Sequence, residues 1–148
     1  MNAPVSSTVS SPAPSPTLTK NQNLVFDVLT KSDAPMSAYT ILDKLRDHGF
    51  RAPLQVYRAL DKLTEFGMVH RLESLNAFVA CAHRESECCG AGHGHGTVAF
   101  AICESCGHVF EFHDHQVDHR LGDWAKGKGF KPAKTTIEIR GLCEACAA

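Results

Sequence analysis

The chain has 148 residues, which is enough for one ordinary domain or two small ones. Its hydrophobic share of 43% and charged share of 21% are typical of a soluble globular protein, and no apolar run approaches the roughly 18–20 residues that span a bilayer. The net charge of −1 neither indicates nor excludes nucleic acid, so a DNA-binding surface would have to be a local patch.

The chain begins with a Ser/Pro-rich stretch, residues 1–18, that has no charged side chain. A secretory signal would need a basic start and an apolar centre, and both are missing. We therefore predict a disordered tail, a cytoplasmic protein and no membrane partner.

The seven cysteines are an odd number and include two CxxC pairs, so they predict reduced thiols and metal binding rather than a disulfide scaffold.

Three amphipathic helical patterns follow the tail, over residues 20–33, 36–49 and 52–67. Ser37 is the predicted N-cap of the second, and Pro53 lies in the first turn of the third. The apolar residues of the third helix share one face, and a polar face lies opposite. This arrangement is typical of a helix-turn-helix unit, although a plain three-helix bundle with a solvated outer face would have the same pattern.

Residues 68–81 alternate as two short strands around a turn near Leu75-Asn76, which predicts a β-hairpin and, with the three helices, a winged helix. If the turn is centred between these two residues, His70 lies opposite Cys81 with Cβ atoms about 5 Å apart. Such a pair would form half of a tetrahedral zinc site. A three-residue loop would shift the register and remove the pairing.

Two CxxC pairs, Cys103/Cys106 and Cys143/Cys146, are separated by a segment with strand and helix patterns of its own. Two such turns supply a four-thiolate tetrahedron, whose soft ligands favour zinc. A thioredoxin-like redox motif needs only one CxxC, so the second pair favours structural zinc. A closed four-cysteine site has no open coordination position and is a poor catalyst.

Several further side chains are candidate metal ligands, although for each histidine among them a solvated side chain is the favoured alternative. Glu111 alternates with two aromatic residues and therefore faces away from them. The Gly-rich segment 82–96 is a predicted hinge that contains His93 and His95. The remaining candidates are His113, His115 and His119; Cys88 and Cys89 are left unassigned.

Together, "YRALDKL…FGMVHRLES", the histidine-bearing hinge, "ICESCGHVFEF" and "GLCEAC" resemble the ferric uptake regulator family of bacterial metal-responsive repressors. The resemblance covers the chain from about Lys20 to Cys146. It is greatest to the zinc uptake regulator branch, because a cysteine ends the wing in "FVAC" and seven residues separate His95 from Cys103.

The resemblance implies an α+β protein of two domains: a winged-helix DNA-binding domain over residues 19–81 and, after the hinge 82–96, a small α/β dimerisation domain over residues 97–148. It implies about two zinc ions per chain. The structural ion would be held by Cys103, Cys106, Cys143 and Cys146. The regulatory ion would be held by His70, Cys81, His95 and Glu111, with His93 as a substitute for His95 because this hinge is one residue longer than expected.

By the same resemblance, Tyr39 and Arg58 lie at positions that the family uses at DNA. An outward arginine can reach guanine in the major groove. The expected function is a zinc-responsive repressor of zinc uptake genes that binds a palindromic operator as a homodimer, with no small-molecule substrate. An iron- or peroxide-responsive regulator is the alternative within the family. A thiol- or metal-dependent enzyme is disfavoured, because the sequence shows no nucleophile–base pair.

Overall fold

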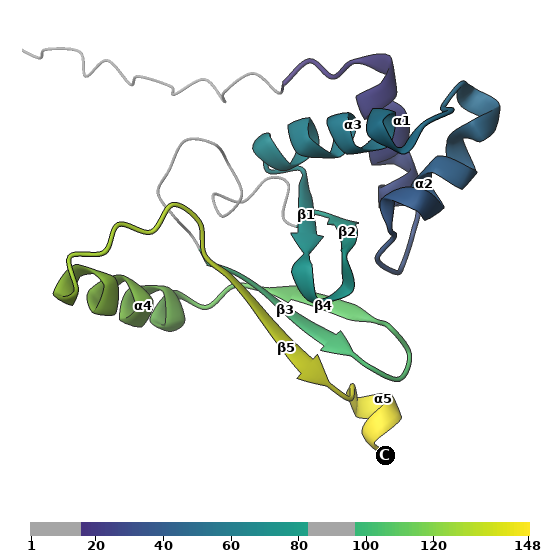
Figure 1. Cartoon of the computed structure of the whole chain (residues 1–148). Coiled ribbons are helices and arrows are strands. Elements are labelled where there is room, and N and C mark those ends of the chain that lie inside the picture. The colour runs from purple at the N-terminus through teal and green to yellow at the C-terminus, as the bar shows by residue number, and fades with distance from the viewer. Residues whose placement is uncertain (1–15, 83–96) are drawn as a thin grey trace, which may run out of the picture.

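The computed structural model describes residues 16–82 and 97–148, which we call the N-terminal half and the C-terminal half. The N-terminal half is a three-helix unit followed by a hairpin that extends away from it (Figure 1). Its elements are α1 (Lys20–Thr30), α2 (Ala38–Leu45), the 3-10 turn η1 (Arg46–His48), α3 (Pro53–Glu65), β1 (Val69–Leu72), the 3-10 turn η2 (Glu73–Leu75) and β2 (Ala77–Ala80).

The helix ends follow from local chemistry. Thr19 and Ser37 cap α1 and α2 by accepting hydrogen bonds from the backbone N–H groups of Gln22 and Thr40. Pro53 opens α3, as the sequence predicts, because its missing N–H would be unpaired there anyway. The second helix is shorter than predicted, since α2 gives way to η1 before the chain reverses at Gly49, whose φ of 93° favours glycine.

The core of the N-terminal half lies between α1, α2, α3 and the hairpin. Val56, Ala59, Leu60 and Leu63 are buried there, which confirms the apolar face predicted for the third helix. Tyr57 packs against the edge of this core. The core thus leaves the opposite face of α3 in solvent.

The hairpin is present, but its predicted register is wrong. Leu72 pairs with Ala77 and His70 pairs with Val79, so His70 does not lie opposite Cys81. The connection is a four-residue loop that ends at Asn76 with φ 46°, rather than a turn centred one residue later. Because the pairing shifts by two residues, Cys81 keeps its face and becomes a diagonal neighbour of His70.

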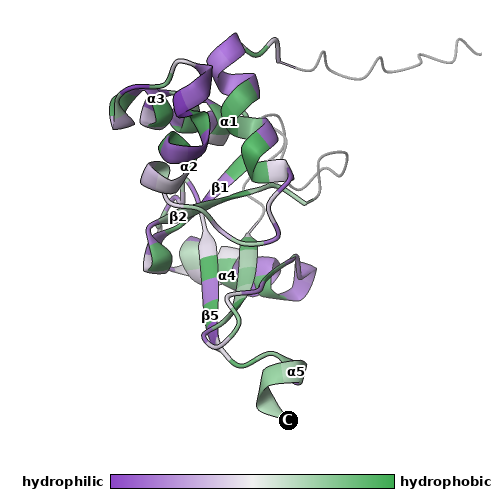
Figure 2. Ribbon diagram, turned by 90° about the vertical axis from the view of Figure 1, so that its right-hand side faces the viewer, coloured by the Kyte–Doolittle hydropathy of each residue, from purple (hydrophilic) through white to green (hydrophobic). Residues whose placement is uncertain are grey.

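The C-terminal half is a three-stranded sheet with one longer helix (Figure 1). Its elements are β3 (Val98–Cys103), β4 (Val109–Phe112), α4 (His115–Gly127), β5 (Thr136–Gly141) and the single-turn α5 (Glu144–Ala147). The strand order is β4-β3-β5, with β4 antiparallel and β5 parallel to the central β3. Figure 2 shows β5 alternating between hydrophobic and hydrophilic residues, as its sequence predicts.

The two halves are in direct contact through the hairpin. Leu72 is fully buried against Phe100 and Ile102 of β3, in a small apolar cluster separate from the main core. Glu138 of β5 adds a polar contact, because its carboxylate accepts hydrogen bonds from the backbone N–H groups of Glu73 (2.7 Å) and Ser74 (3.2 Å) at the hairpin tip. Within residues 16–82 and 97–148, no helix is both long and apolar enough to cross a membrane.

Candidate metal centres

One cluster of metal-ligating side chains lies between the two halves. His70 of β1, Cys81 just after β2 and Glu111 of β4 place one ligand atom each within 4.8 Å of the others. The Nε2 atom of His70 is 3.6 Å from Oε1 of Glu111, and Sγ of Cys81 is 3.7 Å from the same oxygen. All three side chains are nearly buried. We call them the inter-half cluster.

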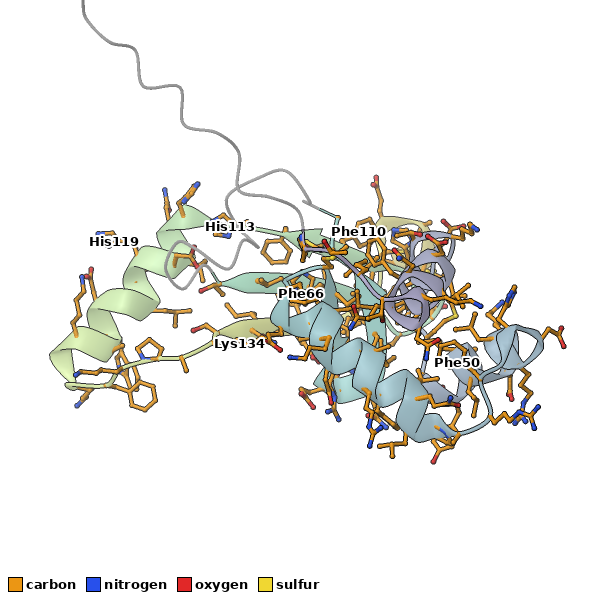
Figure 3. The ribbon with its side chains drawn as sticks, turned by 90° about the horizontal axis from the view of Figure 1, so that it is seen from above. Phe50, Phe66, Phe110, His113, His119 and Lys134 are labelled. Carbon is orange, nitrogen blue, oxygen red and sulfur yellow. The ribbon has the colours of Figure 1, made fainter. Side chains whose placement is uncertain are left out.

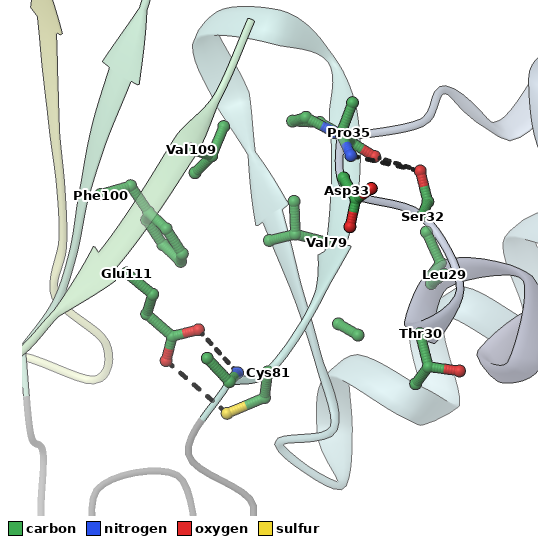
Figure 4. Close-up of a pocket in the computed structure, with 13 residues that line it drawn as sticks. Leu29, Thr30, Ser32, Asp33, Pro35, Val79, Cys81, Phe100, Val109 and Glu111 are labelled. Atoms are coloured by element: carbon green, nitrogen blue, oxygen red, sulfur yellow. Dashed lines mark hydrogen bonds between the residues drawn. The ribbon is translucent and has the colours of Figure 1, made fainter. Parts of the chain in front are cut away.

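Backbone contacts hold the members of the inter-half cluster in place. The N–H of Cys81 donates to the carbonyl of Met68, which fixes the end of β2 beside β1. The N–H of Ala82 donates to Oε2 of Glu111 at 2.9 Å, so this carboxylate contacts the N-terminal half through both oxygens (Figure 4). The aromatic ring of Phe100 lies 5.5 Å from the His70 imidazole and shields it from solvent.

Glu111 faces the hairpin for the reason that the sequence predicts. Along β4, Phe110 and Phe112 are exposed on one face, and the Glu111 side chain is 8% exposed on the other. A pocket of about 290 Å³ opens beside the cluster, between the loop after α1, the end of β2 and the β3–β4 pair (Figure 4). Cys81 and Glu111 line its wall.

A sulfur, a nitrogen and an oxygen within this distance of one another fit a borderline-soft ion such as zinc, which accepts all three ligand types. The predicted fourth ligand, His95, and its substitute, His93, lie outside the described residues. Three members of the predicted regulatory set therefore meet in the structure, although the hairpin pairing proposed from the sequence does not join them.

The two CxxC turns meet at the end of the sheet and form the four-cysteine clasp: Cys103, Cys106, Cys143 and Cys146, with all sulfurs within 4.8 Å of one another. Cys103 ends the central strand, and Cys143 caps the single turn of α5. The sulfurs of Cys106 and Cys143 are 3.7 Å apart, close to the roughly 3.8 Å edge of a tetrahedron with 2.3 Å metal–sulfur bonds.

The first knuckle of the clasp depends on a tight turn. Gly107 follows Cys106 with φ 74°, a conformation that favours glycine, and its N–H donates to the carbonyl of Cys103. The backbone N–H groups of Cys106 and Cys143 point at the Cys103 sulfur, at 3.5 and 3.4 Å. These two donors lower the pKa of the Cys103 thiol from 9.0 to about 6.

Two other thiols in the clasp hold their protons more tightly than usual. The N–H of His108 lowers the pKa of Cys106, but the Cys103 thiol and burial outweigh this effect and raise it above 9.0. A hydrogen bond from Ser105 lowers the pKa of Cys146, but the other three clasp thiols raise it to about 11. Four thiolates this close repel one another, so without a cation some of them keep their protons. The donor set therefore fits zinc.

The remaining histidine candidates separate into two groups. His113 and His115 meet Asp118 at the start of α4, in a third cluster whose ligand atoms lie within 4.8 Å of one another. His119 instead pairs with Asp123 one turn further along α4, at 3.0 Å. His115 and His119 therefore do not act together. Sequence periodicity missed Asp118 as a partner of His113, because the two meet only where the helix begins.

The two side chains predicted to contact DNA are both on the surface. Arg58 is exposed on the polar face of α3, and Tyr39 is 62% exposed in the first turn of α2. Gln55, on the same face of α3, accepts hydrogen bonds from the N–H groups of Arg51 and Ala52 and so anchors the loop before the helix. The structure thus places the exposed Arg58 side chain near the centre of the polar face of α3.

Comparison with known proteins identifies relatives along most of the chain. The sequence pattern of the Ferric uptake regulator family matches residues 16–140. The zinc uptake regulation protein of Escherichia coli (strain K12) is 37% identical over 130 residues, which are 87% of this chain and 72% of the relative.

Solved structures also match most of this chain. Holo XcZur superposes with a TM-score of 0.75 at 41% identity, covering 88% of this chain and 86% of that one. A zinc uptake regulator complexed with zinc and DNA superposes with a TM-score of 0.79 at 36% identity, covering 88% and 83%. The ferric uptake regulator of Helicobacter pylori, at 22% identity and a TM-score of 0.56 over 89% and 83%, shares the fold.

Proposed function

Since the chain belongs to the ferric uptake regulator family, we propose that it is a zinc-responsive transcriptional repressor, which binds operator DNA as a zinc-loaded dimer and controls genes of zinc uptake. The observation that carries this proposal is the inter-half cluster, whose ligands come from both halves of the molecule. Such a protein acts where the DNA is, in the cytoplasm. It is a regulator rather than an enzyme.

The inter-half cluster fits a regulatory site because it is complete only when the hairpin lies against β4. His70 and Cys81 belong to the hairpin, and Glu111 belongs to the sheet. A bound divalent cation would supply charge compensation for the Cys81 thiolate and the Glu111 carboxylate. The ligand therefore has a higher affinity for the closed arrangement, which is the requirement for allosteric coupling. We propose His95, or His93 in its place, as the fourth ligand.

The four-cysteine clasp fits a structural site. Cys103 and Cys106 follow β3, and Cys143 and Cys146 follow β5, so the clasp ties the ends of two parallel neighbours whose connection runs through α4. A small sheet gains stability from such a tie, because the free energy of metal binding adds to the free energy of folding. No coordination position is left open for a substrate.

We propose that the N-terminal half binds DNA through α3. Arg58 stands on its exposed face and has the geometry to reach guanine O6 and N7 in the major groove, with Tyr39 as a flanking contact. The zinc uptake regulator that superposes with this chain was solved in complex with zinc and DNA. A palindromic operator would place the two α3 helices of a dimer about 34 Å apart, in successive major grooves.

Exposed apolar side chains support a homodimer formed by the C-terminal half. The large apolar side chains exposed in this half are Phe110, Phe112, Val117, Leu121, Trp124, Phe130, Ile139 and Leu142. Among the described residues, α4 buries only Ala125 and packs loosely on its own sheet. An apolar patch of this kind marks a partner surface, and a second copy of the chain is the partner that the family leads us to expect.

Cys81 favours zinc over ferrous iron. A soft thiolate in a set with one imidazole and one carboxylate suits zinc better than the oxygen-rich sites typical of iron. The identities of 41% to holo XcZur and 36% to the zinc uptake regulator solved with zinc and DNA support the same choice.

The test is DNA binding measured by fluorescence anisotropy at fixed salt, with buffered free zinc and, separately, anaerobic ferrous iron. The probe is a duplex selected from a random-sequence library by the zinc-loaded protein. Zinc should raise the affinity roughly 5- to 150-fold, which corresponds to a coupling of about 1–3 kcal/mol, and iron should not. Cys81→Ser should remove the zinc response while keeping the clasp zinc and the dimer. A response to iron, or a Cys81→Ser protein that responds normally, contradicts the proposal.

A further inference from the structure

We infer, on the basis of the function proposed above, that Glu138 is a positioning residue for the zinc response. It holds the hairpin against the sheet without the help of a metal ion and so sets how much zinc the chain needs. Three residues lie in one row across the sheet: Phe100 of the central strand β3 pairs with Glu111 of β4 on one side and with Glu138 of β5 on the other. Directly paired residues point to the same face of a sheet. This face therefore has a phenyl ring at the centre of the row and a carboxylate at each end.

The hairpin lies against this face and contacts the first two members of the row. Glu111 accepts a hydrogen bond from the N–H of Ala82, at the base of the hairpin. Leu72, at the end of β1, is fully buried against Phe100 in the small apolar cluster. Figure 3 shows that α4, which carries His119, extends away from the N-terminal half. The sheet face thus provides the surface on which the hairpin rests.

The third member of the row, Glu138, caps the tip of the hairpin. The first N–H groups of a helical turn have no partner within the turn, and Leu72, the residue before η2, makes no side-chain hydrogen bond to them. The two oxygens of Glu138 accept these hydrogen bonds instead, from Glu73 at 2.7 Å and from Ser74 at 3.2 Å. A charged acceptor makes such bonds stronger than a neutral one. Because the acceptor belongs to β5, the tip is capped only while the hairpin lies on the sheet.

The two carboxylates of the row differ in their relation to zinc. Glu111 belongs to the inter-half cluster, whereas Glu138 belongs to none of the groups of metal-ligating side chains that the described residues form. The contact of Glu138 therefore favours the closed arrangement whether or not an ion is bound. A protein binds a ligand more weakly when its binding-competent state is only fractionally populated. The Glu138 contact should accordingly raise both the zinc affinity of the cluster and the affinity for DNA at low zinc.

The test is Glu138→Gln in the full-length chain, because an amide offers one oxygen and turns an NH₂ group toward the second donor. The first measurement is zinc binding without DNA, by competition with a chromophoric chelator, for the equivalent that Cys81→Ser removes. Its affinity should fall about three- to tenfold. The second measurement is DNA binding by anisotropy. The affinity should fall by a similar factor at low zinc and change little at saturating zinc, because the bound ion then holds the halves together.

Glu73→Pro tests the same contact from the side of the donor. Proline has no N–H, so it removes the 2.7 Å hydrogen bond to Glu138, and Glu73 opens its turn, where proline is tolerated. Glu73→Ala is the matched control, since it removes the side chain and keeps the N–H. Glu73→Pro should bind zinc more weakly than Glu73→Ala. Combining Glu73→Pro with Glu138→Gln should add little further loss, because both changes remove one contact.

Glu104→Gln is the control for the loss of a carboxylate, since it removes an exposed one that pairs with Arg140 on the same sheet. It should leave zinc and DNA binding unchanged. The inference is overturned if Glu138→Gln binds zinc with wild-type affinity, or if its DNA affinity falls equally at low and at saturating zinc. The wild-type chain tests the proposed function separately. If zinc does not change its DNA binding, the proposed function fails, whereas zinc competition without DNA still decides the role of Glu138.

Discussion

Glu111 belongs to the proposed regulatory metal site and also contacts the N-terminal half directly. One of its oxygens lies near His70 and Cys81, and the other accepts a hydrogen bond from the backbone of Ala82. Contacts within the protein therefore orient the side chain toward His70 and Cys81. Its orientation also needs no special sequence signal, because strand alternation alone turns it away from Phe110 and Phe112.

At the scale of single residues, the clasp thiols should release protons when they bind zinc. Cys106 and Cys146 have raised pKa values and are protonated at neutral pH, whereas zinc binds thiolates. The affinity should therefore fall as the pH falls, and more steeply below pH about 6, where the Cys103 thiolate also takes up a proton. Calorimetry in two buffers of different ionisation enthalpy, repeated across this range, measures the protons released. Zinc binding without proton release would contradict the pKa values.

Individual ligands were predictable where spacing alone brings them together. The two CxxC turns needed no knowledge of the fold, and the four sulfurs meet as expected. The cluster of His113 with Asp118 was not predictable in this way, because both side chains are oriented by Thr97, which is distant in sequence from both. His95 lies outside the described residues and remains a prediction.

At the scale of elements, the hairpin shows why register is difficult to derive from sequence. The turn near Asn76 was recognised, but its length was not, and the predicted His70–Cys81 pairing was wrong. The four-residue loop is stabilised by Glu138, which accepts hydrogen bonds from two of its amides and is more than 60 residues away in sequence. The apolar pattern predicts only which face of a strand is buried. A register shift of two residues leaves that face unchanged, so the pattern does not distinguish the two registers.

Glu138→Gln should loosen the tip of the hairpin. An amide side chain offers one oxygen in place of two and no charge, and hydrogen bonds to charged groups contribute about 1.5–3 kcal/mol when shielded and less on an exposed turn. The amides of Glu73 and Ser74 should therefore exchange with deuterium faster, while those of the core of the N-terminal half keep their protection.

The control for this change is Glu104→Gln, which removes a carboxylate that pairs with Arg140 at the clasp end of the same sheet. It should leave exchange at the hairpin tip unchanged. If Glu138→Gln has no more effect on exchange at Glu73 and Ser74 than Glu104→Gln, the carboxylate does not hold the turn.

At the scale of the whole molecule, the two halves satisfy their apolar groups differently. The N-terminal half has a continuous core of buried side chains, whereas the C-terminal half buries little beyond Phe100, Ile102 and their neighbours. The stripe of Val117, Leu121 and Trp124 on α4 was predictable from its spacing. Its exposure was not, because the sequence pattern marks a buried face without saying which chain covers it.

Trp124→Glu should convert the dimer into monomers. The side chain is 61% exposed in the single chain, so the substitution should leave the fold and the clasp intact. In a two-fold interface it acts twice, and the loss of about 1.5–3 kcal/mol per buried side chain then weakens association by about 3–6 kcal/mol. Sedimentation velocity over a dilution series measures the shift, and Trp124→Phe is the conservative control. An unchanged dimer would place the interface elsewhere.

The position of β3 at the centre of its sheet has a consequence for the order in which the protein is made. Among the described residues, the side chains of the N-terminal core all come from the first 80 residues, so this half can fold while synthesis continues. By contrast, β3 can pair with β5, and Cys103 can meet Cys143, only after about 40 further residues have been synthesised. During that interval on the ribosome the first clasp thiols lack the second pair, so we expect metal loading to follow the synthesis of Cys143 and Cys146 and to depend on a reducing environment until then.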